Sequence, residues 1–211
     1  MKIAADRIDN YTDEGRYKAS LDTIRSMDSK RYEDISRIRN DVNKRLHMAA
    51  GMLIKDMCDK LGISDPVVGR DKHGKPYIED HPEVCFNLSH SGEYAVIAYG
   101  DRPVGIDIQE KRRVSESFAT RILNETEKQL YDLTDADMIC RVWTMKEAYS
   151  KLIGLGLSYD FRNCVIDREH SRIDDTTGIY ISGTYKGYRV DNDTYMTVVY
   201  ESSDCYAGGG T

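Results

Sequence analysis

The most regular hydrophobic pattern covers residues 33–61, where apolar side chains recur every three or four positions. This spacing predicts a single helix with one buried stripe, and Gly62 is expected to end it. A second long helix is expected to open at Asp135 or Asp137 and to run to Ile153, with Ser115 and Asn124 as N-caps of shorter helices before it. The two long helices lie in opposite halves of the chain.

Shorter apolar or alternating runs predict strands around both helices. In the first half they cover residues 1–8, 67–70, 77–78 and 93–99, with a polar helix at 16–27; in the second half they cover 104–108, 164–166, 179–181, 188–190 and 195–200. Each half therefore combines a long helix with antiparallel strands, which is an α+β arrangement without βαβ alternation. A tight turn at residues 100–103 divides the chain into subdomains 1–102 and 103–206, followed by a flexible tail at 207–211.

Composition narrows the class of protein further. The longest apolar run, residues 95–99, is far shorter than the roughly 20 residues that cross a bilayer, and the first twenty residues lack a secretory pattern. Five widely spaced cysteines without a CxxC pair indicate reduced thiols. We therefore expect a cytoplasmic protein with no membrane partner.

Charge argues against nucleic acid as a partner, because the net charge is −6. The distribution is uneven, since residues 25–45 hold seven basic against four acidic side chains. This stretch indicates either a local anion site or a solvated helix face.

A pair of polar residues follows the aliphatic positions of the strand predicted at residues 104–108. Asp107 and Gln109 are two positions apart, so their side chains share one face of the strand. Taken alone, this is also the pattern of a half-buried strand with a polar outer face. An acid at a strand end is, however, a place where oxygen atoms hold a hard cation, and Mg²⁺ usually takes one or two carboxylates together with water and phosphate.

A second candidate lies on the long helix of the second half. Glu147 and Lys151 are one turn apart on one face, and Lys146 is adjacent. An ordinary surface ion pair has the same spacing. The only tryptophan in the chain, Trp143, lies one turn before Glu147 and indicates that this face is partly buried. Between two lysines, the Glu147 carboxylate is expected to stay ionised at neutral pH, which suits it to bind metal or accept a proton while the lysines hold phosphate.

A third candidate is residues 86–92, predicted as a loop before a strand. Ser89 and His90 in such a loop can donate hydrogen bonds to phosphate oxygens, although a turn capped by Asn87 and Ser89 explains the same residues. His90 has no sequence partners that suggest zinc. Neighbouring Ser and His side chains are rarely placed as a nucleophile pair.

Four segments in this order resemble one family. They are Gly74-Lys75-Pro76, Asn87-Leu88-Ser89-His90-Ser91, Gly105-Ile106-Asp107 and Trp143-Thr144-Met145-Lys146-Glu147-Ala148 with Lys151. Together they are similar to the signature set of Sfp-type 4'-phosphopantetheinyl transferases over roughly residues 20–200. The resemblance implies an α+β fold of two similar subdomains related by pseudo-twofold symmetry, with coenzyme A in the cleft between them.

The resemblance also implies an activity. It is the Mg²⁺-dependent transfer of the phosphopantetheine arm of coenzyme A to a serine of an apo acyl or peptidyl carrier protein, with release of adenosine 3',5'-bisphosphate. The expected protein is a monomer, and its carrier belongs to fatty acid, polyketide or nonribosomal peptide biosynthesis. We expect the first subdomain to bind the coenzyme A phosphates and the second to hold the metal and the catalytic residues.

The resemblance assigns roles residue by residue. Asp107, Gln109 and Glu147 would hold Mg²⁺, and Glu147 or a water at the metal would take the serine proton. Lys146 and Lys151 would contact the pyrophosphate and complete the catalytic set with Glu147. The coenzyme A phosphates and adenosine would be bound by Lys75, Ser89 and His90, with Lys30, Lys44 and Arg45 as a looser match at the 3'-phosphate.

One position departs from the family pattern, because Gln109 stands where bacterial members most often have glutamate. An amide oxygen can still ligate a metal, but the site loses one negative charge. A non-catalytic coenzyme A or carrier-binding module with the same fold is therefore the alternative hypothesis. The basic run Lys111-Arg112-Arg113 is a candidate for steering an acidic carrier or a solvated turn.

Overall fold

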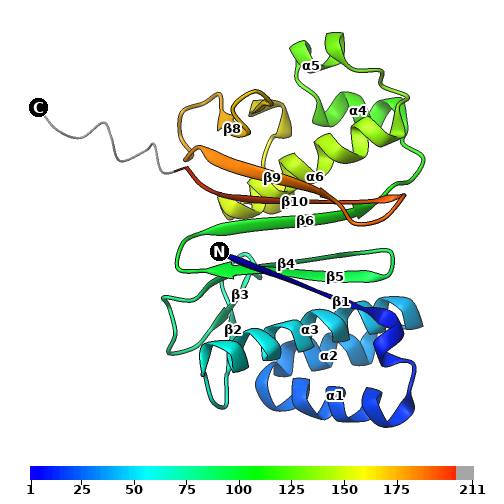
Figure 1. The fold of residues 1–211 in the computed structure, drawn as a ribbon, viewed down its shortest axis with the longest axis vertical. Coiled ribbons are helices and arrows are strands. Elements are labelled where there is room, and N and C mark those ends of the chain that lie inside the picture. The colour runs from blue at the N-terminus through cyan, green and yellow to red at the C-terminus, as the bar shows by residue number, and fades with distance from the viewer. Residues whose placement is uncertain (203–211) are drawn as a thin grey trace, which may run out of the picture. The chain divides into compact units, whose positions relative to one another are not determined.

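The computed structural model describes residues 1–202. The chain divides into unit 1, Met1–Arg102, and unit 2, which begins at Pro103. Both units contain helices and antiparallel strands, which confirms the predicted α+β class (Figure 1). The tail expected to be flexible, residues 207–211, lies outside the described residues. Within residues 1–202, no helix is both long and apolar enough to cross a membrane.

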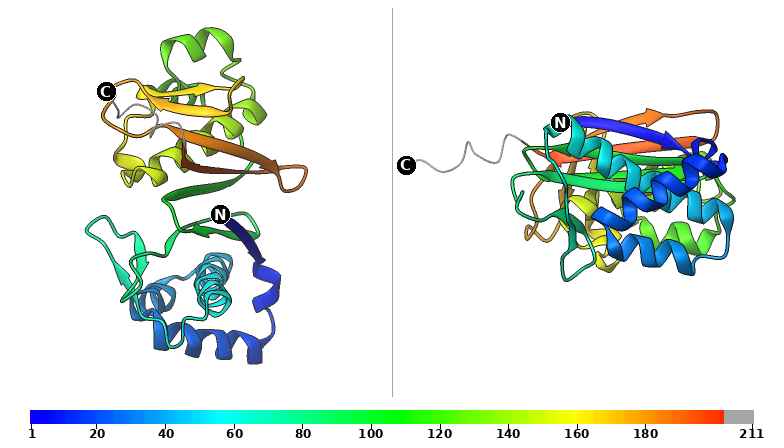
Figure 2. Two further views of the ribbon diagram at one scale, coloured as in Figure 1. Left: turned by 60° about the vertical axis from the view of Figure 1, so that its left-hand side comes forward. Right: turned by 90° about the horizontal axis from the view of Figure 1, so that it is seen from below.

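Unit 1 begins with a strand, continues through three helices and ends with two hairpins. Its elements are β1 (Lys2–Arg7), the 3₁₀ helix η1 (Ile8–Tyr11), α1 (Glu14–Met27), α2 (Ser29–Arg37), α3 (Asp41–Leu61), β2 (Val68–Arg70), β3 (Pro76–Ile78), β4 (Cys85–Ser91) and β5 (Tyr94–Gly100). The main sheet has the strand order β1–β5–β4, and β2 pairs with β3 in a separate hairpin (Figure 2). The predicted strands at residues 1–8, 67–70, 77–78 and 93–99 are thus confirmed.

The core of unit 1 lies between α3 and one face of the sheet. Leu53 and Met57 of α3 belong to the same buried apolar cluster as Ile97 and Ala95 of β5. Residues 95 and 97 are two apart and therefore share a face of the strand. This helix face contributes methyl and methylene groups to the core. The contact between α3 and the sheet is therefore stabilised by the hydrophobic effect.

The single helix predicted over residues 33–61 is wrong at its first part. The chain ends α2 at Arg37, runs through an extended Ile38 and starts α3 at Asp41. Asn40 is the reason, because its side chain accepts a hydrogen bond from the backbone N–H of Asn43 and so caps a new helix. The apolar spacing continues across this break, so periodicity alone does not reveal it. Gly62 ends α3 at φ 74°, as predicted.

Unit 2 has the same kind of content in a larger sheet. Its elements are β6 (Val104–Glu110), α4 (Glu116–Ile122), α5 (Glu125–Leu130), α6 (Ala136–Leu152), the 3₁₀ helices η2 (Gly156–Ser158) and η3 (Phe161–Asn163), β7 (Cys164–Asp167), β8 (Arg172–Asp175), β9 (Gly183–Arg189) and β10 (Thr194–Glu201). The strand order is β6–β10–β9–β8–β7, and every pairing is antiparallel. The predicted caps Ser115, Asn124 and Asp135 all accept backbone hydrogen bonds at helix starts.

One strand prediction in unit 2 is wrong. Residues 179–181 are not part of a strand, whereas the polar segment Arg172–Asp175 forms β8. The Tyr149 hydroxyl donates to the carbonyl of Ile181, and Asp175 accepts from the backbone N–H of Ile179. Side chains therefore form hydrogen bonds with the backbone of this apolar stretch, where a neighbouring strand would otherwise do so.

Candidate functional site

The candidate site of unit 2 lies where α6 crosses β6. Gly105 makes the close approach possible, because a Cβ atom at this position would lie 1.9 Å from the carbonyl oxygen of Ala148 and 2.6 Å from the amide nitrogen of Leu152. Residue 107 is two positions further along the strand, so Asp107 projects from the same face, beneath the helix. The glycine of the Gly-Ile-Asp segment thus brings the helix down onto the aspartate.

Asp107 meets a cation from that helix. The Lys151 ammonium donates to Asp107 Oδ1 at 2.7 Å and to the carbonyl of Ile106 at 3.1 Å. Asp107 is only 6% exposed. The interpretation of residues 104–108 as a half-buried strand with a polar outer face is therefore wrong, because this polar face is covered by α6. The strand also extends to Glu110, so Asp107 stands in its middle and not at its end.

Glu147 completes the cluster from the same helix face as Lys151. Its side chain is buried, and among residues 1–202 its Oε1 has no hydrogen-bond partner. Burial raises the pKa of Glu147 to about 7, the negative charge of Asp107 adds to the shift, and Lys151 opposes it. The expectation that Glu147 stays fully ionised at neutral pH is corrected accordingly: it sits beside another carboxylate and one lysine, not between two lysines.

These features fit a cation at Asp107 and Glu147. A buried carboxylate oxygen without a donor, next to a second carboxylate, is an arrangement that a hard cation stabilises. Gln109 lies on the same strand face, and its amide Nε2 donates to the carbonyl of Glu110 at 3.0 Å. Within residues 1–202 there is no group of three or more His, Cys, Asp or Glu side chains placed to hold a metal. A metal here would rest on two carboxylates, with an amide oxygen and non-protein ligands.

Lys146 does not join this cluster, which corrects its predicted role at the pyrophosphate. Its side chain is completely buried, and its ammonium donates to Glu127 Oε2 at 2.6 Å and to three backbone carbonyls. Successive helix residues point about 100° apart, so Lys146 and Glu147 leave α6 in different directions. With its donors engaged inside the protein, Lys146 has none for a phosphate.

The face of α6 above the sheet carries further polar contacts that the sequence did not single out. Thr144 Oγ1 lies 3.0 Å from Thr197 Oγ1, and Arg141 donates to the Tyr195 hydroxyl at 3.2 Å. Tyr195 and Thr197 stand opposite Gln109 and Asp107 in the β10–β6 register. Residues 141, 144 and 151 are spaced by whole helical turns from Glu147 or from one another. This spacing was the signal in the sequence that could have placed Arg141 and Thr144 on the same face of α6 as Lys151.

The predicted residues of unit 1 are distributed over two elements. The segment with Ser89 and His90 is strand β4 and not a loop, so these neighbours point to opposite faces of the sheet. Ser89 is buried and His90 is exposed. On the α3 side, the His90 ring lies 5.2 Å from the ring of His47. Lys75 lies in the β2–β3 turn, where its backbone N–H donates to Asp71.

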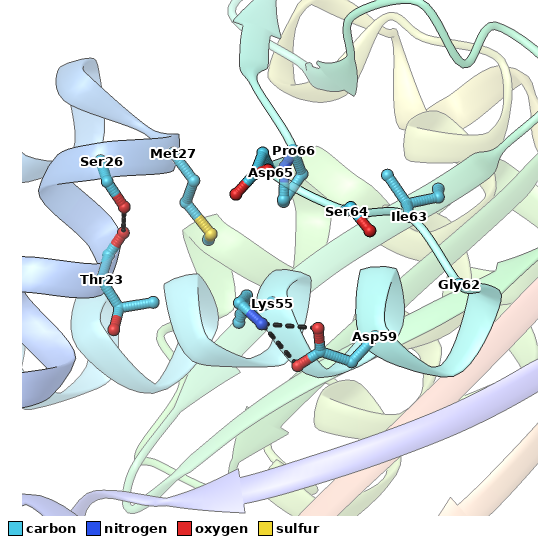
Figure 3. A pocket seen from close by; sticks show the side chains of 10 residues that line it. All are labelled: Thr23, Ser26, Met27, Lys55, Asp59, Gly62, Ile63, Ser64, Asp65 and Pro66. Atoms are coloured by element: carbon cyan, nitrogen blue, oxygen red, sulfur yellow. Dashed lines mark hydrogen bonds and ion pairs between the residues drawn. The ribbon is translucent and has the colours of Figure 1, made fainter.

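The three residues predicted at a 3'-phosphate are not gathered in one place by any contact in unit 1. Lys30 binds Asp34 at 2.6 Å on the surface of α2. Lys44 and Arg45 of α3 line a cavity of about 250 Å³ that Tyr11 also lines. A larger cavity of about 510 Å³ near the end of α3 contains the Lys55–Asp59 ion pair and none of the predicted site residues (Figure 3).

A buried ion cluster in unit 1 was missed. Asp28 is fully buried and accepts from Arg31 Nε at 3.1 Å and from Arg70 Nη2 at 2.7 Å. Asp28 also caps α2 through the backbone N–H of Arg31. The capping pattern was readable in the sequence, whereas Arg70 lies 42 positions away and had no signal.

Comparison with known families finds one matching family model for each unit. A model described as "4'-phosphopantetheinyl transferase superfamily" matches residues 103–192, and one described as "4'-phosphopantetheinyl transferase, N-terminal" matches residues 14–101. The chain belongs to the 4'-phosphopantetheinyl transferase superfamily. The resemblance drawn from the sequence motifs is thereby confirmed.

Curated relatives within the superfamily include both bacterial and animal proteins. The chain is 36% identical to 4'-phosphopantetheinyl transferase Sfp of Bacillus subtilis over 103 residues, which are 47% of this chain and 46% of the relative. It is 33% identical to 4'-phosphopantetheinyl transferase psf-1 of Bacillus pumilus over 58% of this chain and 56% of the relative.

A longer alignment is found with a human protein. The human L-aminoadipate-semialdehyde dehydrogenase-phosphopantetheinyl transferase is 27% identical over 72% of this chain and 56% of that protein. The chain thus spans about half the length of the curated relatives it matches. A solved holo-[acyl-carrier-protein] synthase of Thermotoga maritima aligns at TM-score 0.35 and 27% identity, over 47% of this chain and 63% of that chain.

Proposed function

We propose that this protein transfers the 4'-phosphopantetheine arm of coenzyme A to a serine of an apo acyl or peptidyl carrier protein. The proposal is carried by one observation, the buried Asp107–Glu147–Lys151 cluster in a member of the 4'-phosphopantetheinyl transferase superfamily. The names of its relatives supply the reaction class. A pure binding module has no need for a buried carboxylate whose pKa lies near neutrality.

In the proposed reaction, the serine Oγ forms a bond to the phosphorus that carries the pantetheine arm. The bond from this phosphorus to the bridging pyrophosphate oxygen breaks, and adenosine 3',5'-bisphosphate leaves with the electron pair. Such displacements depend on positioning and on charge stabilisation more than on covalent catalysis. The protein must therefore supply a proton acceptor and a positive charge.

Glu147 is the proposed acceptor of the serine proton. A general base works best when its pKa lies near the operating pH, and in the absence of bound metal, burial together with Asp107 raises the pKa of Glu147 to about 7. Lys151, bound to Asp107 at 2.7 Å, is the proposed cation for the leaving pyrophosphate oxygens.

A bound Mg²⁺ would supply positive charge to the pyrophosphate oxygens. Asp107 and Glu147 are the residues that would hold it, with Gln109 as the amide neighbour on the same face. This proposal extends to the coenzyme A side, where Lys75, Ser89 and His90 would contact phosphates and adenosine, with Lys30, Lys44 and Arg45 as further cations. Lys146 is excluded from this set by its internal hydrogen bonds.

The test is a transfer assay read by intact mass. The protein is incubated with coenzyme A, Mg²⁺ and a panel of apo carrier proteins, and each carrier is expected to gain one phosphopantetheine group if it is a substrate. Glu147→Gln should lower the rate by about 10²–10⁴-fold, the usual contribution of a general base. Glu169→Gln, an exposed carboxylate in the β7–β8 turn, serves as the matched control and should leave the rate unchanged.

Two arms of the assay separate the hypotheses. Chelation of the metal should abolish transfer and its replacement should restore it. Binding of coenzyme A without any mass gain on any carrier would contradict the transferase and support the non-catalytic module. Full activity of Glu147→Gln would instead refute Glu147 as the base.

A further inference from the structure

The lysine of the Lys146-Glu147 pair lies in an unusual environment. Its side chain has no solvent exposure, and within the described residues its ammonium has four oxygen acceptors. They are Glu127 Oε2 at 2.6 Å and the carbonyls of Ile122 at 2.9 Å, Phe161 at 3.0 Å and Cys164 at 3.1 Å. An ammonium has three protons to donate, so this lysine is saturated from inside the protein.

The partner carboxylate, Glu127, is also buried and hydrogen-bonded inside the protein. Glu127 is 6% exposed and forms the capping box of α5, where its Oε2 accepts from the backbone N–H of Asn124 at 2.9 Å. Its Oε1 has no hydrogen-bond partner among residues 1–202. The Glu127 charge is therefore compensated chiefly by Lys146, and a buried charge without such a partner is costly.

The four acceptors belong to segments that are separate along the chain. Ile122 ends α4, Glu127 lies in α5, Phe161 begins η3 and Cys164 begins β7. Figure 1 shows α4 and α5 at the end of unit 2 away from β6, and Leu130 of α5 is 69% exposed. With so little apolar burial on α5, the ion pair is a principal attachment of this helix to α6.

We propose that Lys146 and Glu127 form a buried latch that fixes the rotation and position of α6, and thereby positions Glu147 against β6. Lys146 is a positioning residue in this inference and does not contact substrate. Because residues 146 and 147 are consecutive, holding the first side chain at the back of the helix fixes the direction of the second. The catalytic part of the inference rests on the proposed function, whereas the structural part does not.

A double-mutant cycle tests the structural part. Lys146→Met leaves Glu127 buried without its cation, and Glu127→Met leaves the ammonium without its anion. Each single variant should lower the midpoint of thermal unfolding by roughly 10 °C, because breaking a buried pair is far more costly than removing it entirely. The double variant should recover part of this loss, because no buried charge is left unpaired, although three carbonyls and the Asn124 N–H still lack their partners. Losses that simply add in the double variant would overturn the latch.

Transfer kinetics test the positioning role. In Lys146→Met, kcat should fall about 10- to 100-fold through a displaced Glu147, with an unchanged KM for coenzyme A, and the double variant, which also lacks the latch, should stay slow even though it regains part of its stability. Lys186→Met, which removes an exposed charge on β9 of the same unit, is the control and should change neither constant. A KM for coenzyme A that rises in the single variant and stays raised in the double variant would identify Lys146 as a ligand and overturn the inference.

The two parts fail separately. If the unsubstituted protein transfers nothing to any carrier, the proposed function fails, and the unfolding cycle still decides whether the latch exists. If transfer occurs but the cycle shows no coupling between Lys146 and Glu127, the latch fails and the proposed function stands.

Discussion

The two units share a strand order and differ in what lies between helix and sheet. In unit 1 the first strand, β1, pairs with the last strand, β5, which pairs with the one before it, β4; in unit 2, β6, β10 and β9 repeat this order. The long helix of each unit packs on its sheet. Under α3 the contact is apolar, whereas under α6 it contains Asp107, Thr197 and Tyr195.

This difference shows that the architecture alone does not determine the chemistry. One arrangement of helix and sheet supports a hydrophobic core in unit 1 and a polar layer in unit 2. The polar layer costs stability, because burying carboxylates is unfavourable unless they are compensated. In unit 2 this loss of stability falls on Asp107 and Glu147, the carboxylates that the proposed function uses.

The buried charges of the two units are balanced in opposite ways. In unit 1, one carboxylate, Asp28, is held by Arg31 and Arg70. In unit 2, two carboxylates, Asp107 and Glu147, share one ammonium from Lys151. Neutralising Asp28 should therefore destabilise unit 1, whereas neutralising Glu147 should stabilise unit 2 without metal.

The largest expected effect is in unit 1. Asp28→Asn removes the charge that two arginines face, and the loss of a buried pair should cost about 3–5 kcal/mol of unfolding free energy. Asp34→Asn, which breaks the exposed pair with Lys30, is the matched control and should cost about 1 kcal/mol or less. Chemical denaturation measures both, and equal losses would contradict the proposed charge balance.

The second effect has the opposite sign. The pKa of Glu147 lies at about 7 against an ordinary 4.5, so the folded state binds more protons between these values and loses stability as pH rises through them. In the presence of a chelator at pH 8, Glu147→Gln should raise the free energy of unfolding by on the order of 3 kcal/mol. The gain should shrink toward pH 4.5. A variant that is less stable than the parent at pH 8 would contradict this.

The third prediction concerns the close approach of α6 to β6. Gly105→Ala places a methyl group 1.9 Å from the Ala148 carbonyl, so the helix must move, at a cost of about 1–3 kcal/mol. Gly187→Ala on β9 is the control, because within the described part of the chain no atom lies within 4 Å of its Cβ position. Transfer should slow only in the first variant. Equal behaviour of both would show that the approach is not required.

The smallest effect is expected at the basic run after β6. Arg112 and Arg113 are exposed, whereas Lys111 binds Asp193 at 2.9 Å. Replacing both arginines by alanine should raise KM for the carrier about 2- to 5-fold, as expected for surface charges, and leave KM for coenzyme A unchanged. Lys111→Ala should have a weaker effect. An equal change in both constants would exclude carrier steering.

Local signals in the sequence predicted much of the fold. The caps Ser115, Asn124 and Asp135 and the stop at Gly62 act within one turn, so their chemistry is readable. The helix is interrupted at Ile38, inside a regular apolar pattern, because Asn40 caps a new helix, and residues 179–181 are apolar without being a strand. In both places side-chain hydrogen bonds outweighed periodicity.

The sequence predicted which residues form most of the candidate site, but not which face of α6 each of their side chains occupies. The sequence placed Glu147, Lys151 and Asp107 in one group, and the structure brings them together. It also placed Lys146 there, since adjacency in sequence does not say which face of α6 meets the sheet. Glu127, 19 positions away, decides that question through a tertiary contact.

The shared strand order also has a kinetic consequence. In each unit the first strand pairs with the last, so Lys2 meets Tyr99 and Val104 meets Tyr200. Such long-range pairings slow folding, because a large loop must close before they form. During synthesis, unit 1 can close its sheet once β5 has left the ribosome. Unit 2 must wait for β10, so the polar layer beneath α6 is among the last parts of the described chain to be assembled.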